Sequence, residues 1–168
     1  MTLKEKLEQL TQLNAGFFDK NAGTEATGPL GELGLNTDNL KGTGSVLNFQ
    51  GPDSVKALQK QHLDDDPNKI PMMFMMDVVH GCRTIYPVPL GLSASFDPQL
   101  VKDCCAMAAK EAAAEGINVT FAPMADLARD ARWGRVMEST GEDPYLNCLY
   151  SRAAVEGFQG DLKKGKVA

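Results

Sequence analysis

The chain has 168 residues, of which 43% are hydrophobic and 23% are charged, and its formal net charge is −5 at neutral pH. This composition is typical of a soluble globular protein and excludes a disordered or fibrous chain. The negative charge argues against a nucleic-acid-binding surface, because phosphate binding needs clustered basic residues and the only such cluster, Lys163 to Lys166, lies at the very end.

The start of the chain lacks the basic-then-apolar pattern of a signal peptide, and no apolar run reaches the roughly 18 residues that a membrane span needs. We therefore expect a cytoplasmic protein that binds neither a membrane nor nucleic acid. The cysteines lack the Cys-x-x-Cys spacing of zinc sites, which predicts reduced thiols and no metal at Cys82, Cys104, Cys105 and Cys148.

The first predicted element is a helix that begins after Thr2. Thr2 and Glu5 have the spacing of a capping box, in which each side chain accepts a hydrogen bond from a backbone N–H of the first turn. One face of this helix would carry Leu3, Leu7, Leu10 and Leu13 before Asn14 and Gly16 end it. The glycine-rich residues 16–44 are predicted to form an irregular surface segment.

The rest of the chain alternates between strands and helices. Strands are predicted at 45–49, 70–76 and 117–122, and helices at 53–63, 98–115 and 144–159. Asp97 and Asp143 each precede a proline, which is the pattern of an N-cap followed by the first helical residue, and Gly116 and Gly160 end these helices. His62 is expected at the surface of its helix, and Val167 and Ala168 look like the start of another strand.

This alternation predicts a parallel sheet wrapped by helices, either doubly wound or closed into a barrel. No Gly-x-Gly-x-x-Gly motif joins a strand to a helix, which disfavours a dinucleotide-binding fold. The long segments 77–97 and 123–143 favour a barrel whose catalytic face is built from such loops. The predicted fold class is therefore α/β, a (β/α)8 barrel-like fold of which this chain carries the first strands and helices.

Two apolar runs end abruptly in charged residues. The run 70–76 is followed by Asp77, His80 and Arg83, and the run 117–123 leads into a charged stretch that ends at Arg135. Buried parallel strands read as continuous apolar runs, and α/β folds place ligand sites beyond the carboxyl ends of such strands. The two strand ends therefore predict one shared polar pocket.

The residues around these strand ends resemble a known family. The stretches Asp77-Val-Val-His-Gly-Cys-Arg83, Pro89-Leu-Gly-Leu-Ser-Ala-Ser-Phe-Asp-Pro98 and Arg129-Asp-Ala-Arg-Trp-Gly-Arg135 are similar to the N-terminal barrel domain of family 3 glycoside hydrolases, the β-glucosidase and β-xylosidase group. The resemblance covers nearly the whole chain and is weakest across residues 17–42. It implies that residues 1–168 are the N-terminal portion of one barrel domain, with no second domain and no cofactor.

The resemblance also implies roles for individual residues. Asp77 would accept hydrogen bonds from the hydroxyls of the non-reducing sugar, and Arg83 and Arg135 would donate to that sugar. The partners expected to orient these groups are His80, Arg132 and Glu138. The structural alternatives are that Asp77 caps the turn after its strand and that each arginine clamps a carboxylate such as Glu138 or Asp143.

The implied reaction is hydrolysis of terminal β-linked glucose or a related sugar with retention of configuration. In this family the nucleophile and the acid/base residue come from later segments, so no catalytic residue is assigned and the chain alone is expected to be inactive. The rival hypothesis is a non-catalytic unit that pairs with a second copy or with a complementary chain, because a partial barrel leaves open strand edges.

Overall fold

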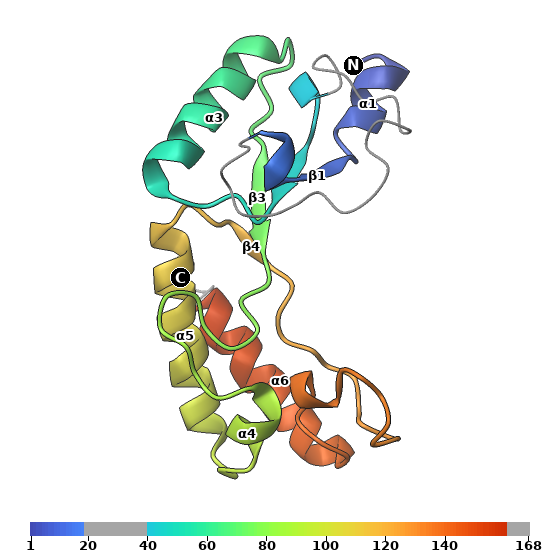
Figure 1. Ribbon diagram of the computed structural model, residues 1–168, viewed down its shortest axis with the longest axis vertical. Coiled ribbons are helices and arrows are strands. Elements are labelled where there is room, and N and C mark those ends of the chain that lie inside the picture. The colour runs from blue at the N-terminus through green and yellow to red at the C-terminus, as the bar shows by residue number, and fades with distance from the viewer. Residues whose placement is uncertain (19–39, 161–168) are drawn as a thin grey trace. The chain divides into compact units, whose positions relative to one another are not determined.

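A computed structural model of the chain describes residues 1–18 and 40–160 (Figure 1). The chain divides into two compact units, one formed by Met1–Met76 and Ala114–Val119 and the other by Asp77–Ala113 and Thr120–Ala168. The elements, in chain order, are α1 (Leu3–Glu8), β1 (Gln12–Asn14), η1 (Ala15–Phe17), β2 (Ser45–Leu47), α3 (Pro52–Asp65), β3 (Met73–Met76), α4 (Pro89–Ser93), α5 (Pro98–Ala114), β4 (Val119–Thr120), η2 (Val136–Glu138) and α6 (Pro144–Gln159).

The strands form a sheet in the order β1-β2-β3-β4, which is also their order in the sequence. β1 pairs with β2 and β2 pairs with β3, both in parallel, and the register places Leu13 opposite Val46 and Val46 opposite Phe74. The backbone N–H of Asn118, just before β4, donates to the carbonyl oxygen of Phe74 over 2.9 Å. Parallel neighbouring strands, of which β2 and β3 are connected through α3, confirm the predicted α/β organisation.

The core of the first unit lies along the central strands. Val46 and Phe74, which face each other in the register, are almost completely buried, and Met72 just before β3 is buried as well. The ring centroids of Phe49 and Phe74 are 6.0 Å apart, within the range of favourable aromatic contact. In β3, however, Met73 is 45% exposed, so the continuous apolar run of the sequence is not buried on both faces there.

The second unit is built on three helices. The core cluster joins α4, α5 and α6 and consists of Leu92, Val101, Tyr150, Ala153 and Ala154. The buried hydroxyl of Tyr150 donates to the carbonyl oxygen of Ser93 over 2.9 Å, which ties α6 to α4. A Cβ atom added to Gly157 would lie 2.5 Å from the carbonyl oxygen of Lys102, so α6 and α5 pack closely at this glycine.

The predicted helix starts are confirmed. The Thr2 and Glu5 capping box is formed, with the Thr2 N–H donating to Glu5 Oε2 over 2.6 Å. Asp97 Oδ1 accepts from the N–H of Gln99 over 2.9 Å, and Asp143 Oδ1 accepts from the N–H of Leu146 over 2.8 Å. These carboxylates satisfy N–H groups that have no partner inside the helix, and they fix where α5 and α6 begin.

Three predictions about the first unit are wrong in detail. The first helix ends at Glu8, and Leu13 belongs instead to β1, because residues 12–14 pair with β2. The strands at 70–76 and 117–122 are shorter than predicted, since β3 begins only at Met73 and β4 covers only Val119–Thr120. His62 is buried and its Nε2 lies 2.9 Å from the carbonyl oxygen of Ile70. Most of the segment 16–44 and the predicted strand start at 167–168 lie outside the described residues.

Candidate functional site

All the residues predicted for the sugar site lie in the second unit. Asp77 is its first residue and directly follows β3. The next residue, Val78, is completely buried, and its N–H donates to Thr120 Oγ1 over 3.2 Å, whereas Asp77 is exposed. This contact fixes the main chain beside Asp77 and leaves the carboxylate accessible to a ligand.

The segment from His80 to Tyr86 forms a closed loop that carries Arg83. The N–H of Tyr86 donates to the carbonyl oxygen of His80 over 2.8 Å, and His80 Nδ1 lies 3.2 Å from the carbonyl oxygen of Tyr86. Gly81 and Ile85 add an antiparallel bridge between these ends. Because a carbonyl oxygen only accepts, Nδ1 carries the proton in this contact. His80 therefore joins the two ends of the loop, residues 80–81 and 85–86, which we call its neck. Arg83 lies at the opposite end, the tip.

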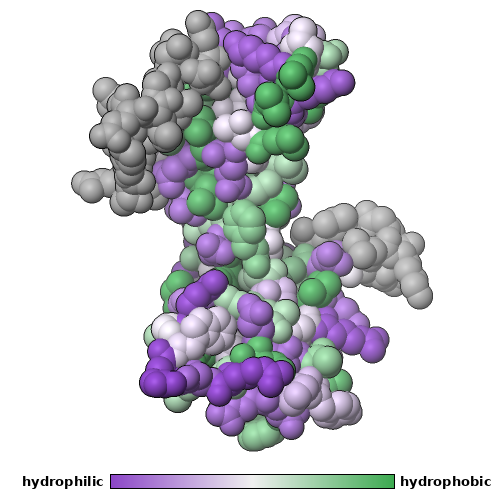
Figure 2. All heavy atoms as spheres, turned by 90° about the vertical axis from the view of Figure 1, so that its right-hand side faces the viewer, coloured by the Kyte–Doolittle hydropathy of each residue, from purple (hydrophilic) through white to green (hydrophobic). Residues whose placement is uncertain are grey.

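The longer loop between β4 and α6 is also closed at its neck. The N–H of Ala128 donates to the carbonyl oxygen of Gly141 over 3.0 Å. The buried amide of Asn147 on α6 donates to Thr140 Oγ1 over 3.0 Å and to the carbonyl oxygen of Asp126 over 3.4 Å. In Figure 2 the face of the second unit that carries this loop is rich in hydrophilic residues. The fastened neck gives the charged loop a defined position.

Arg135 and Glu138 form a two-point ion pair inside this loop. Arg135 Nε donates to Glu138 Oε1 over 2.9 Å, and Arg135 Nη2 donates to Glu138 Oε2 over 2.7 Å. The short helix η2 places the carboxylate three residues after the guanidinium, which suits this forked geometry. The expectation that Glu138 contacts and orients Arg135 therefore agrees with the geometry, and so does the alternative of a carboxylate clamp.

Glu138 dominates the electrostatic surroundings of Arg135. The pKa of Arg135 is raised, chiefly by its hydrogen bonds to Glu138 and in addition by the negative charges of Glu138, Asp126 and Asp77, while burial opposes this shift. Asp77 makes the smallest of these contributions, so the shift reflects mainly the ion pair with Glu138. The shared pocket beyond the two strand ends stays a prediction.

Arg132 does not take the place predicted for it. Its side chain is 90% exposed, and the hydrogen bonds from its Nε and Nη2 all go to the carboxylate of Asp130, two residues earlier. Within residues 1–18 and 40–160, Arg132 makes no contact that would orient Asp77, Arg83 or Arg135. The pair closes a local turn instead, in which Asp130 Oδ1 also accepts from the N–H of Arg132.

Three residues that hold the site were missed by sequence reasoning. Thr120 anchors the chain beside Asp77, Asn147 fastens the longer loop, and Glu111 on α5 accepts hydrogen bonds from the tip of the shorter loop. Each is a single polar residue in a strand or helix, so the local pattern gives no signal for a distant backbone partner. The described residues contain no cluster of three or more His, Cys, Asp or Glu side chains suited to a metal ion.

Residues 2–168 match the family model described as the glycosyl hydrolase family 3 N-terminal domain. The chain belongs to glycoside hydrolase family 3. The N-terminal domain of family 3 is barrel-like, so the predicted fold class is confirmed. A crystal structure of the Listeria innocua β-glucosidase in complex with glucose superposes with a TM-score of 0.88 and is 46% identical, covering 98% of this chain and 23% of that one.

Two relatives within family 3 extend the comparison. The "Periplasmic beta-glucosidase" of Salmonella typhimurium is 35% identical over 160 residues, which are 95% of this chain and 20% of the relative. The "Putative beta-xylosidase" of Formosa agariphila is 34% identical over 176 residues, covering 96% of this chain and 22% of that protein. The chain therefore spans about a fifth of the length of these family 3 relatives.

The names of two relatives, one periplasmic and one lysosomal, bear on localisation. The Salmonella relative carries a periplasmic location in its name, so the cytoplasmic location predicted for this family 3 chain gains no support. Among the helices that the structure describes, none combines the length and the apolar character that a membrane crossing requires.

Proposed function

We propose that the full product of this gene hydrolyses terminal β-D-glucosyl or related residues with retention of configuration, and that Asp77, Arg83 and Arg135 belong to its sugar-binding subsite. Residues 1–168 would form the N-terminal portion of one barrel domain. The observation that carries this proposal is the placement of the exposed Asp77 directly after β3 and of Arg135 in the loop after the neighbouring strand β4. Membership of family 3 supports the reaction type.

The proposed chemistry suits the geometry of these groups. An ionised carboxylate such as that of Asp77 accepts hydrogen bonds from two adjacent sugar hydroxyls. Glu138 engages Nε and one Nη2 proton of Arg135, and the other N–H groups of this guanidinium have no partner in the described part of the chain. Those donors point away from the ion pair and are available to a sugar, because the five N–H groups of a guanidinium form a fixed planar fork.

The sugar itself is proposed from the relatives. The Listeria innocua enzyme, which is 46% identical, binds glucose in its crystal structure, whereas the Formosa relative is named a β-xylosidase. We favour glucose because the identity to the glucose-binding enzyme is higher. Release of p-nitrophenol from the β-glucoside and the β-xyloside at equal concentrations separates the two sugars.

The reaction is tested by comparing the 168-residue chain with the full product of its gene. Retaining hydrolysis needs two carboxyl groups about 5–5.5 Å apart, and we assign no carboxylate of this chain to either role. We expect the full product to hydrolyse p-nitrophenyl β-D-glucoside and the chain alone to show no turnover above background. A gene product that is inactive on β-glycosides, or a 168-residue chain as active as the full product, would contradict the proposal.

A second candidate function, association without catalysis, is favoured by one observation in the first unit. Leu3, Leu7 and Leu10 on and after α1 are 74%, 57% and 83% exposed, and hydrophobic residues gather on the face that carries α1 and β1 (Figure 2). Exposed apolar clusters favour contact with another chain. We expect multi-angle light scattering of the chain to report a dimer or larger species that Leu7→Lys dissociates. A monomer at all concentrations would remove this candidate.

A further inference from the structure

The loop from His80 to Tyr86 is fastened at two places, its neck and its tip. The neck is closed by the paired backbone of His80 and Tyr86 and by the bridge between Gly81 and Ile85. Gly81 has φ +122°, and a Cβ atom there would overlap the carbonyl oxygen of Thr84, so the turn is tight. A closed neck fixes where the loop leaves the chain, but it does not fix the direction of the tip.

The tip is held by a single carboxylate from another element. Glu111 on α5 accepts from the N–H of Arg83 over 2.9 Å, from the N–H of Thr84 over 2.8 Å and from the Thr84 hydroxyl over 2.6 Å. One side chain thus satisfies three donors at two successive residues. Hydrogen bonds to an ionised carboxylate are stronger than neutral ones, and three in a fixed arrangement define a direction.

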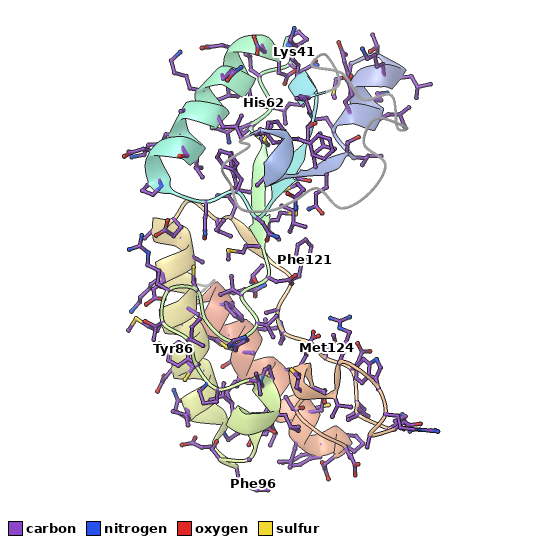
Figure 3. The ribbon with its side chains drawn as sticks, viewed as in Figure 1. Lys41, His62, Tyr86, Phe96, Phe121 and Met124 are labelled. Carbon is purple, nitrogen blue, oxygen red and sulfur yellow. The ribbon has the colours of Figure 1, made fainter. Side chains whose placement is uncertain are left out.

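The loop also packs against the helix that carries Glu111. His80 and Tyr86 share a small cavity wall with Cys104, Cys105 and Ala108 of α5. Tyr86 lies beside α5 in Figure 3, and its pKa is raised by burial and by the charges on the same helix, that of Glu111 included. Helix and loop therefore form one packed body, in which Glu111 is the polar contact at the tip.

The carboxylate of Glu111 is ionised across the neutral range. Its pKa is lowered, chiefly by the hydrogen bond from the Thr84 hydroxyl and further by the N–H groups of Thr84 and Arg83. A lowered pKa in the folded state means that the anchoring is complete above the ordinary pKa of a glutamate and is lost as the pH falls through the lowered value. The tip is thus fixed under the conditions in which a sugar would bind.

From this geometry we propose that Glu111 is a positioning residue. It fixes the tip of the 80–86 loop and thereby orients the side chain of Arg83 toward the sugar. This inference rests on the proposed function. Among residues 1–18 and 40–160, the Glu111 carboxylate accepts hydrogen bonds only from the loop, so it acts through Arg83, whose backbone N–H it holds. The side chain of Arg83 emerges from a main chain that Glu111 clamps on both of its sides, at Arg83 and at Thr84.

The test is a double-mutant cycle in the full product of the gene, with kcat and KM measured separately on p-nitrophenyl β-D-glucoside. The loss of this anchor weakens substrate binding before and during reaction alike, so we expect Glu111→Ala to raise KM about tenfold and to leave kcat within about twofold. In an Arg83→Ala background the same substitution should have no further effect on KM, because a positioning residue acts only through the group that it positions.

Two controls keep the test decisive. Asp103→Ala removes an exposed carboxylate of α5 that, within the described residues, accepts a side-chain hydrogen bond only from Gln99, and it should leave KM unchanged. If Glu111→Ala fails to fold, Thr84→Val removes the hydroxyl donor alone and should raise KM by about twofold. If Glu111→Ala raised KM equally in the wild-type and in the Arg83→Ala background, the positioning role would be overturned, whereas the proposed function would stand. A wild-type protein inactive on β-glycosides would overturn both.

Discussion

Replacing Asp77 by asparagine should reduce kcat/KM of the full gene product for p-nitrophenyl β-D-glucoside by roughly 100- to 10,000-fold. The amide has nearly the same size but lacks the negative charge. A hydrogen bond to a charged group contributes about 1.5–3 kcal/mol, and two such bonds to neighbouring sugar hydroxyls would be weakened together. The substitution leaves the fold intact, because Asp77 is exposed and its anchor is the N–H of Val78.

The matched control for Asp77 is Asp130→Asn. Asp130 is also an exposed loop aspartate of the second unit, but its carboxylate bonds to Arg132. We expect this variant to retain activity within about threefold, as for most surface substitutions away from a site. An Asp77→Asn protein with wild-type kcat/KM would show that Asp77 only ends its strand, which is the structural alternative.

Replacing Phe74 by alanine should destabilise the folded chain by about 3–5 kcal/mol, the usual cost of removing a fully buried aromatic ring. Phe74 is 1% exposed, faces Val46 in the neighbouring strand and contacts the ring of Phe49. Since domains are stable by only about 5–15 kcal/mol, this is a large fraction of the total. Urea unfolding followed by circular dichroism measures the change.

The neighbouring residue provides the control for this prediction. Met73 precedes Phe74 in the same strand but is 45% exposed. Met73→Ala should therefore shift the urea midpoint by less than half as much as Phe74→Ala. Equal shifts for the two variants would mean that the burial pattern of β3 is not the one described.

Local signals explain which parts of the fold could be predicted from the sequence. The helices that begin after Asp97 and Asp143 were predicted almost to the residue, because an acidic N-cap and a following proline are local features. The first helix was predicted too long, because the pairing of Leu13 with Val46 joins residues far apart in the chain. Periodicity within one segment carries no information about such a partner.

In the candidate site, too, local features of the sequence could be predicted and contacts between distant residues could not. Asp77 and Arg135 are predicted as site residues because each follows an apolar strand within a long motif, and parallel strands bring their ends to one side; their roles stay a prediction. The same motif predicts an orienting role for Arg132, yet its guanidinium donates hydrogen bonds to the carboxylate of Asp130, two residues earlier. Glu111 was missed because a glutamate in a helix usually faces solvent, and only the folded chain shows the Arg83 and Thr84 donors that it accepts.

A crystal structure of the full gene product with glucose bound tests the central claim most directly. The account predicts one sugar whose hydroxyls lie within about 3 Å of both the Asp77 carboxylate and the Arg135 guanidinium, with Glu138 still paired to Arg135. A glucose bound elsewhere, or one that contacts Arg135 while the Asp77 carboxylate turns away from it, would contradict the account.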